Sequence, residues 1–200
     1  MSILEVKNLK KIYTTRFGGN KVEALRNVSF GVEQGEYVAI MGESGSGKTT
    51  LLNILAALDK PTGGTVTLNG KNLSQIRESE MAVFRRDNLG FVFQEFNLLD
   101  TFTLEDNIYL PLVLAGKRYE EMEKRLGPIA RQLGIEGLLK KYPYEVSGGQ
   151  KQRAAVARAL ITRPRLILRM SPPERWTPGP LMSCCAFLGI STAADRRSSW

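Results

Sequence analysis

Eight consecutive residues have the types and the spacing that bind the phosphate groups of a nucleotide. They fit the pattern G-x-x-x-x-G-K-[ST], in which glycines let backbone N–H groups turn toward a phosphate and a helix N-terminus adds positive potential. In such a loop Lys48 would reach the β- and γ-phosphates, and the hydroxyl of Thr49 would ligate Mg²⁺. The candidate nucleotide-binding residues are Gly42, Glu43, Ser44, Gly45, Ser46, Gly47, Lys48, Thr49 and Thr50.

A second helix start with the chemistry of an anion site lies far downstream. Ser147 is a good helix cap, and Gly148 and Gly149 leave the first N–H groups of the helix accessible. Gln150 completes the run. Alone, this motif fits a capped helix equally well. Together with the first loop, it gives one chain two helix starts that can bind phosphate.

Alternating strands and helices are predicted to position these two motifs. The first loop follows a short apolar strand and opens a helix, which is the context that the motif requires. The apolar pattern predicts strands at 3–13, 22–32, 36–41, 65–70, 89–93 and 165–168. It predicts helices at 51–58 and 148–163, and across 103–141, where Gly127 and Pro128 predict a break. The chain is therefore expected to be an α/β protein.

The composition is that of a globular protein with a basic surface. Of the 200 residues, 42% are hydrophobic and 24% are charged, and the net charge of +8 permits an anionic partner. The absence of histidine excludes histidine-based catalysis. The adjacent Cys184 and Cys185 make a poor disulfide framework. No apolar run approaches the ~18 residues of a membrane span, and residues 1–5 lack the basic start of a signal peptide.

On these motifs, residues 1–168 resemble the ATP-binding subunit of ABC transporters. That family's signature is L-S-G-G-Q, and here Val146 replaces the leucine before Ser147. The resemblance implies an α/β P-loop ATPase core with an antiparallel β lobe and an α-helical subdomain at about 95–150, truncated at the C-terminal end. It also implies ATP and Mg²⁺ as cofactors. The nucleotide would lie between the phosphate loop of one subunit and the signature of another, in a head-to-tail homodimer.

Two further residues receive roles from the resemblance. Tyr13 matches the aromatic residue that stacks on adenine, although a tyrosine packed in an early strand is the structural alternative. Gln94 matches the glutamine that contacts Mg²⁺ and the attacking water. The metal contacts implied in this chain are therefore Thr49 and Gln94.

The subfamily follows from three segments, at 22–25, 94–101 and 107–112. They resemble ATPases that work with FtsX-type permeases, and residues 97–101 are most similar to the bacitracin and antimicrobial-peptide exporters. Lipoprotein-release, macrolide-export and cell-division ATPases are close alternatives. The resemblance implies an FtsX-type permease as partner, no nucleic acid, and a cytoplasmic subunit held peripherally at the inner face of the membrane. The charge also fits a chromosome-handling relative, but this chain has no room for the long coiled coil of that class.

The resemblance breaks where the family carries its catalytic carboxylates. The strand at 165–168 should lead into A-D-E-P-T-G-A-L-D-S, but Met170 and Ser171 occupy the carboxylate positions. Neither side chain replaces a carboxylate as a ligand or as a general base. The switch histidine is absent as well.

Back-translation from Arg169, with one G restored in front, reads GCG GAT GAG CCC ACC GGA GCG CTG GAC TCC, which encodes the expected segment. The same frame turns the two cysteine codons into leucine codons.

A lost nucleotide therefore explains residues 169–200, which we expect to be an out-of-frame, disordered tail. The tail would leave a buried strand edge of the central sheet uncovered. The chain as written is expected to bind nucleotide without hydrolysing it, whereas its parent is an ATPase. The alternative is a genuine divergent tail on a non-hydrolysing nucleotide-binding or regulatory module.

Overall fold

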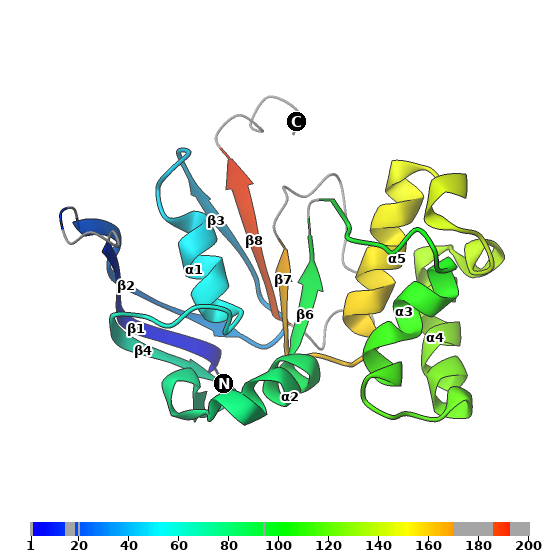
Figure 1. Ribbon diagram of the computed structural model, residues 1–200, viewed down its shortest axis with the longest axis horizontal. Coiled ribbons are helices and arrows are strands. Elements are labelled where there is room, and N and C mark those ends of the chain that lie inside the picture. The colour runs from blue at the N-terminus through cyan, green and yellow to red at the C-terminus, as the bar shows by residue number, and fades with distance from the viewer. Residues whose placement is uncertain (1, 15–18, 20, 94, 170–185, 193–200) are drawn as a thin grey trace.

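The computed structural model describes residues 2–14, 19, 21–93, 95–169 and 186–192. Their strands form two four-stranded sheets that lie next to each other (Figure 1). The antiparallel sheet has the order β2-β1-β4-β5, from β1 (Ser2–Thr14), β2 (Lys21–Glu33), β4 (Gly63–Leu68) and β5 (Lys71–Asn72). The parallel sheet has the order β3-β8-β7-β6, from β3 (Tyr37–Gly42), β8 (Ala186–Thr192), β7 (Leu166–Arg169) and β6 (Leu89–Val92).

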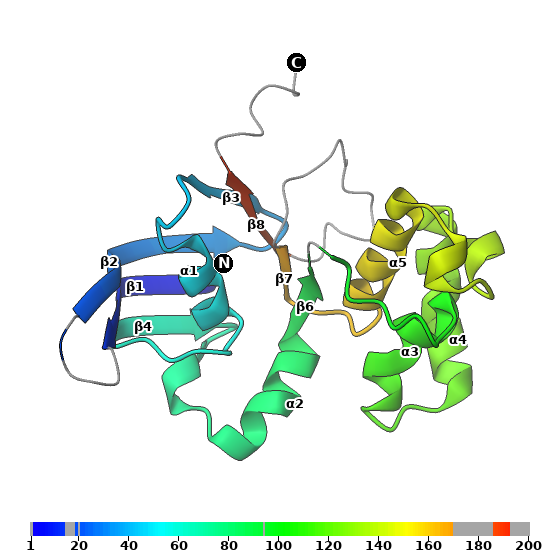
Figure 2. The ribbon, with the colours of Figure 1, turned by 45° about the horizontal axis from the view of Figure 1, so that its top comes forward.

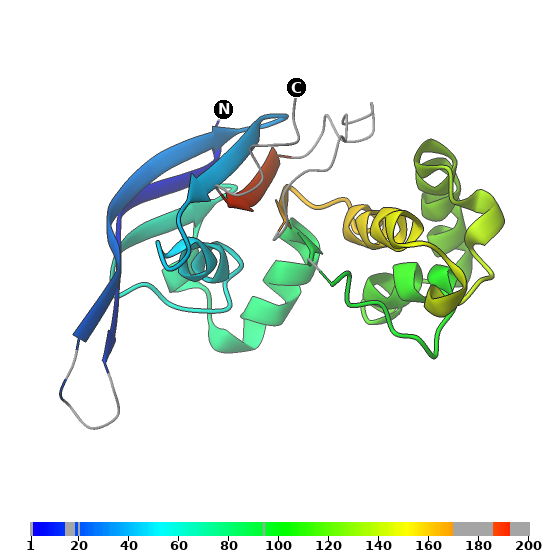
Figure 3. The same cartoon turned by 90° about the horizontal axis from the view of Figure 1, so that it is seen from above.

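The helices divide between the two ends of the molecule. Helix α1 (Lys48–Leu55) follows β3 and lies beside the antiparallel sheet, and α2 (Glu78–Asn88) leads into β6 (Figure 2). Helices α3 (Leu104–Val113), α4 (Tyr119–Leu133) and α5 (Gly148–Leu160) form a separate lobe at the opposite end (Figure 3). Single 3₁₀ turns lie at Leu73–Gln75, Glu136–Leu138 and Pro143–Glu145. This confirms the predicted α/β core with a β lobe and a helical lobe.

Strand β7 joins the two hydrophobic cores. Leu166 and Leu168 belong to the core under the antiparallel sheet, α1 and α2, whereas Ile167 belongs to the core of the helical lobe. Successive side chains of a strand point to opposite faces, so one short strand can serve both cores. All three residues are at most 2% exposed. The parallel sheet is therefore the layer that holds the β lobe and the helical lobe together.

The expectation that the tail leaves a strand edge of the central sheet uncovered is wrong. Arg169 is the last residue of β7, and β8 fills the place between β3 and β7 that we expected to be uncovered. Strand β8 pairs in parallel with six residues of β3, from Tyr37 to Gly42, and with four of β7. These ladders are made by backbone groups, so a segment outside the family's frame can still form them. Residues 170–185 and 193–200 lie outside the described part, and their expected disorder stays a prediction.

The predicted break at Gly127 and Pro128 is also wrong. Helix α4 continues through both residues, and the chain instead turns at 114–118, where Gly116 has φ +67°. An interior proline costs a helix about 3 kcal/mol. In α4 that cost is offset by one buried face, formed by Met122, Leu126, Ile129, Ala130 and Leu133. Packing of that face decides the helix boundary.

Two glycines of α4 are expected to respond oppositely to alanine. At Gly127, inside the helix, a Cβ would meet nothing within 4 Å, so Gly127→Ala should raise the free energy of unfolding by about 0.5–1 kcal/mol. Gly134 ends the helix with φ +62°, and Gly134→Ala should lower the free energy of unfolding by about 1 kcal/mol. Urea unfolding of both variants measures the difference. Equal shifts would contradict this account of α4.

Within the described residues, none of the helices has both the length and the apolar character that crossing a bilayer requires.

Candidate nucleotide-binding site

The phosphate loop connects the C-terminal end of β3 to the N-terminus of α1. Gly45 and Gly47 have φ +82° and +87°, a backbone region that disfavours other residues. Gly47 is also tightly enclosed, because a Cβ there would lie 2.3 Å from the carbonyl oxygen of Ala24 in β2. A glycine is therefore required at position 47 both by the dihedral angles of the backbone and by the close approach of β2. This close approach also fixes the loop against the antiparallel sheet.

The side chain of Lys48 folds over its own loop. Its Nζ donates hydrogen bonds to the carbonyl oxygens of Gly42 (2.9 Å) and Glu43 (2.5 Å) and lies 3.3 Å from the Ser46 hydroxyl. All three partners are uncharged oxygens, so the ammonium group has no carboxylate partner among these bonds. An anion at the loop would supply the missing negative charge.

The N-terminus of α1 has no cap from a side chain. Its N-cap is Gly47, and its first turn contains no acidic residue. The first N–H groups of a helix have no partner inside the helix, and they attract anions when no side chain caps them. Thr49 is exposed in this first turn, where its hydroxyl is accessible to a metal ion. Loop, lysine and helix end thus form one site for an anionic group.

Tyr13 lies near the end of β1, and its side chain is not packed in the core. The residue is 42% exposed, so the alternative of a buried tyrosine is not supported. Its hydroxyl lies 2.8 Å from Oδ2 of Asp59, and the ammonium of Lys11 lies 4.8 Å from its ring centroid. In the β1–β2 ladder Tyr13 pairs with Val22, two residues before Ala24. The backbone of Tyr13 is therefore near the strand segment that touches the phosphate loop, and its hydroxyl points to Asp59, beyond the C-terminal end of α1.

The second motif forms a capped helix start, as predicted. Ser147 is the N-cap of α5: its backbone N–H donates to Oε1 of Gln150 (2.8 Å), and its Oγ accepts from the Gln150 N–H (3.4 Å). Gly148 and Gly149 are exposed, and a Cβ on either would meet nothing within 4 Å. These glycines leave the surface above the helix end open to an approaching group.

The two helix starts face the same side of the molecule but do not form one site. Figure 1 shows the phosphate loop and the N-terminus of α5 both at the upper side, where the parallel strands end, with the parallel sheet between them. Gln94, Met170 and Ser171 lie outside the described residues. Within the described part, no group of three or more acidic or cysteine side chains could hold a metal ion.

A contact that the sequence did not reveal links α5 to the segment after β6. The guanidinium of Arg158 donates to the carbonyl oxygens of Phe96 (2.6 Å) and Asn97 (2.5 Å), both of which have positive φ. Burial lowers the pKa of Arg158. The link spans more than sixty residues of chain, so no local pattern could have predicted it. It ties the helix of the second motif to the loop that follows Gln94.

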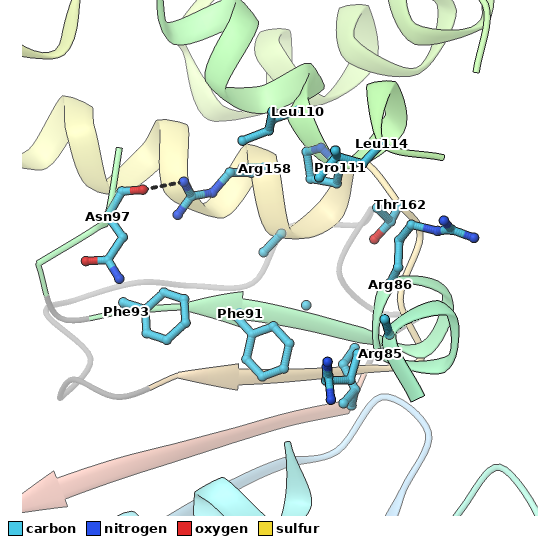
Figure 4. A pocket seen from close by; sticks show the side chains of 14 residues that line it. Arg85, Arg86, Phe91, Phe93, Asn97, Leu110, Pro111, Leu114, Arg158 and Thr162 are labelled. Atoms are coloured by element: carbon cyan, nitrogen blue, oxygen red, sulfur yellow. Dashed lines mark hydrogen bonds between the residues drawn. The ribbon is translucent and has the colours of Figure 1, made fainter. Parts of the chain in front are cut away.

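A groove lies between α2 and β6 on one side and the helical lobe on the other. It has a volume of about 560 Å³, and Figure 4 shows Phe91 and Phe93 on its floor, with Leu110, Pro111 and Leu114 opposite. Arg85, Arg86 and Arg158 add positive charge to its walls.

A phosphate loop between a parallel strand and a helix, with a second open helix start on the same side, defines a P-loop nucleotide-binding protein. The chain belongs to the ABC transporter family, whose model, described as "ABC transporter", matches residues 25–169. The ATP-binding protein YxdL of Bacillus subtilis is 52% identical over 86% of this chain and 65% of its own length. The bacitracin export ATP-binding protein BceA of Halalkalibacterium halodurans is 46% identical over 86% and 67%. The chain thus spans about two thirds of the length of these relatives.

Solved structures agree with this assignment. The ATP-binding cassette MJ0796, in a dimeric post-hydrolysis state bound to ADP and Pi, is 34% identical, with a TM-score of 0.77. The match covers 94% of this chain and 87% of that one.

Proposed function

We propose that this chain is the ATP-binding subunit of an ABC exporter, with ATP and Mg²⁺ as cofactors. The observation that carries the proposal is the phosphate loop, whose lysine has uncharged oxygen partners within the described residues and lies beside an uncapped helix end. The triphosphate lies on this loop, Thr49 and Gln94 hold Mg²⁺, and Tyr13 stacks on adenine. Bound Mg²⁺ would neutralise charge on the phosphate oxygens.

We also propose that ATP binding closes a head-to-tail homodimer. Support comes from the placement of the two helix starts, which face the same side of the molecule with the parallel sheet between them (Figure 1). A second copy would place its Ser147–Gln150 segment over the phosphates held by the first. The dimeric structure described for MJ0796, bound to ADP and Pi, supports the formation of a dimer.

The partner that we propose is an FtsX-type permease at the inner face of the cell membrane, with the ATPase on the cytoplasmic side. A helix of the permease would occupy the groove of Figure 4. The named relatives include export proteins for bacitracin and for macrolides, the latter MacB of Mannheimia succiniciproducens, which is 40% identical. Export of antimicrobial peptides is the transport function that we favour.

We infer, in addition, that the chain as written binds ATP without sustained hydrolysis. Met170 and Ser171 stand where the family carries carboxylates, and the family match ends at residue 169. This end coincides with the position at which the inferred reading frame changes, which supports a lost nucleotide ahead of Arg169. The proposed nucleotide-binding domain therefore corresponds to 1–168.

Titration of the full chain with a fluorescent ATP analogue tests nucleotide binding. Lys48→Ala removes the only ammonium in the loop, so the analogue is expected to bind about tenfold more weakly. Lys124→Ala is the matched control, because Lys124 is an exposed lysine of α4 in the other lobe. Equal affinity of the wild-type and Lys48→Ala chains would overturn the proposed site.

A further inference from the structure

The carboxylate of Asp59 bridges two residues of β1. Its Oδ1 lies 2.6 Å from Nζ of Lys11, and its Oδ2 accepts a hydrogen bond of 2.8 Å from the hydroxyl of Tyr13. Lys11 also donates to the carbonyl oxygen of Lys60 at 2.7 Å. One carboxylate therefore fixes an ammonium and a phenol at the same time.

The same arrangement fixes the Tyr13 ring by one of its faces. Lys11 and Tyr13 are two residues apart on β1 and so project from the same side of the strand. The ammonium lies 4.8 Å from the ring centroid, within the range of a cation–π contact. The Lys11 side chain is only 12% exposed, whereas Tyr13 is 42% exposed. With one face directed at Lys11 and the hydroxyl held by Asp59, the ring has little freedom to turn.

Asp59 is itself held in place by the end of α1. The chain leaves that helix through Ala57, which has φ +54°, and the N–H groups of Leu58 and Asp59 both donate to the carbonyl oxygen of Asn53 (2.9 and 3.2 Å). The helix that starts at the phosphate loop thus ends in the turn that carries the carboxylate. The loop and the Tyr13 ring are connected through α1 as well as through β2.

The charge of the carboxylate is stabilised locally. Burial alone would raise the pKa of Asp59, but hydrogen bonds from Lys11, Tyr13 and the Lys60 N–H, together with the charge of Lys11, lower this pKa overall. The carboxylate is therefore ionised at neutral pH, and hydrogen bonds to an ionised acceptor are the stronger ones.

We propose that Asp59 is a positioning residue for nucleotide recognition, holding the Tyr13 ring with its open face toward the base. The proposal rests on the proposed ATP-binding function and adds to it the group that orients the base contact. Base stacking on an aromatic ring contributes about a tenfold or larger factor in affinity, so a freely turning ring would lose part of that factor.

The test compares two ligands on the full chain, ATP and inorganic tripolyphosphate, which lacks the base. Asp59→Ala is expected to weaken ATP binding about three- to tenfold and to leave tripolyphosphate binding unchanged. Asp59→Asn, which keeps an acceptor for the phenol, should recover part of the ATP affinity. Glu78→Ala is the matched control, because Glu78 forms an exposed ion pair with the neighbouring Lys60 at 2.9 Å.

A double-mutant cycle separates positioning from general destabilisation. On a Tyr13→Ala background, Asp59→Ala should weaken ATP binding no further. Equal losses for ATP and tripolyphosphate, or an undiminished loss on the Tyr13→Ala background, would overturn the positioning role while leaving the phosphate site intact. A wild-type chain that binds neither ligand would overturn the ATP-binding function and this inference with it.

Discussion

Restoring the inferred reading frame ahead of Arg169 is expected to raise steady-state ATP hydrolysis by at least about 10²-fold. A general base contributes roughly 10² to 10⁴-fold to a rate, and loss of metal support adds to that deficit. In the restored frame the codons of Met170 and Ser171 yield part of A-D-E-P-T-G-A-L-D-S, which supplies both carboxylates together. Phosphate release, measured with and without a permease of the proposed FtsX type, compares the two chains.

Two controls make this comparison decisive. Lys48→Ala in the restored chain should return hydrolysis to background, because the phosphates lose their ammonium contact. Met170→Asp combined with Ser171→Glu in the unrestored chain should recover little, since the later aspartate and the switch histidine of the family are still missing. If the unrestored chain hydrolyses ATP as fast as the restored one, residues 169–200 are functional protein and the frameshift hypothesis is wrong.

Asn107→Ala is expected to lower the free energy of unfolding by about 2–3 kcal/mol. Asn107 is completely buried in α3, where its amide oxygen accepts from the Leu99 N–H at 2.7 Å. Its amide nitrogen donates to the carbonyl oxygens of Leu99, Phe102 and Thr103 at 2.9 to 3.2 Å. Alanine would remove the side-chain partner of the Leu99 N–H and of the Phe102 carbonyl, whereas the carbonyls of Leu99 and Thr103 still accept from the Phe102 and Asn107 N–H groups. Each unsatisfied buried group costs about 1–3 kcal/mol.

Urea unfolding, with Asn88→Ala as control, tests this expectation. The Asn88 side chain donates to the carbonyl oxygen of Phe84 at 3.0 Å, and loss of this single bond should cost about 1 kcal/mol. A loss below 1 kcal/mol for Asn107→Ala would show that water replaces the amide. Hydrogen exchange should also accelerate at 99–103, since Asn107 holds that loop against the helix.

The phosphate loop and the capped start of α5 could be predicted because their chemistry is local. Each combines a few adjacent residues of restricted type, such as Gly47 with Lys48, and folding leaves that spacing unchanged. Helix α2 was not predicted, because only Met81 and Phe84 are buried along its eleven residues and the apolar period is weak. Its position depends on packing against β6 rather than on its own sequence.

The long-range contacts around the candidate site could not be predicted from the sequence. Asp59 reaches Tyr13 across 46 residues, and Arg158 reaches Phe96 across 62. Each pairing depends on how separate elements meet in space. The continuity of α4 through Pro128 has the same origin, because the buried face of the helix outweighs the local preference of proline.

The central position of β8 has a consequence for the order of folding. The antiparallel sheet and the helical lobe are each built from segments that lie near one another along the chain, and such contacts form fast. Strand β8 is far from β3 in sequence. Within the described residues, it lies between β3 and β7 and pairs with both of them. During synthesis, both lobes can therefore collapse before the strand that lies between β3 and β7 has left the ribosome. Since β3 ends at Gly42, the candidate phosphate loop is expected to become rigid last.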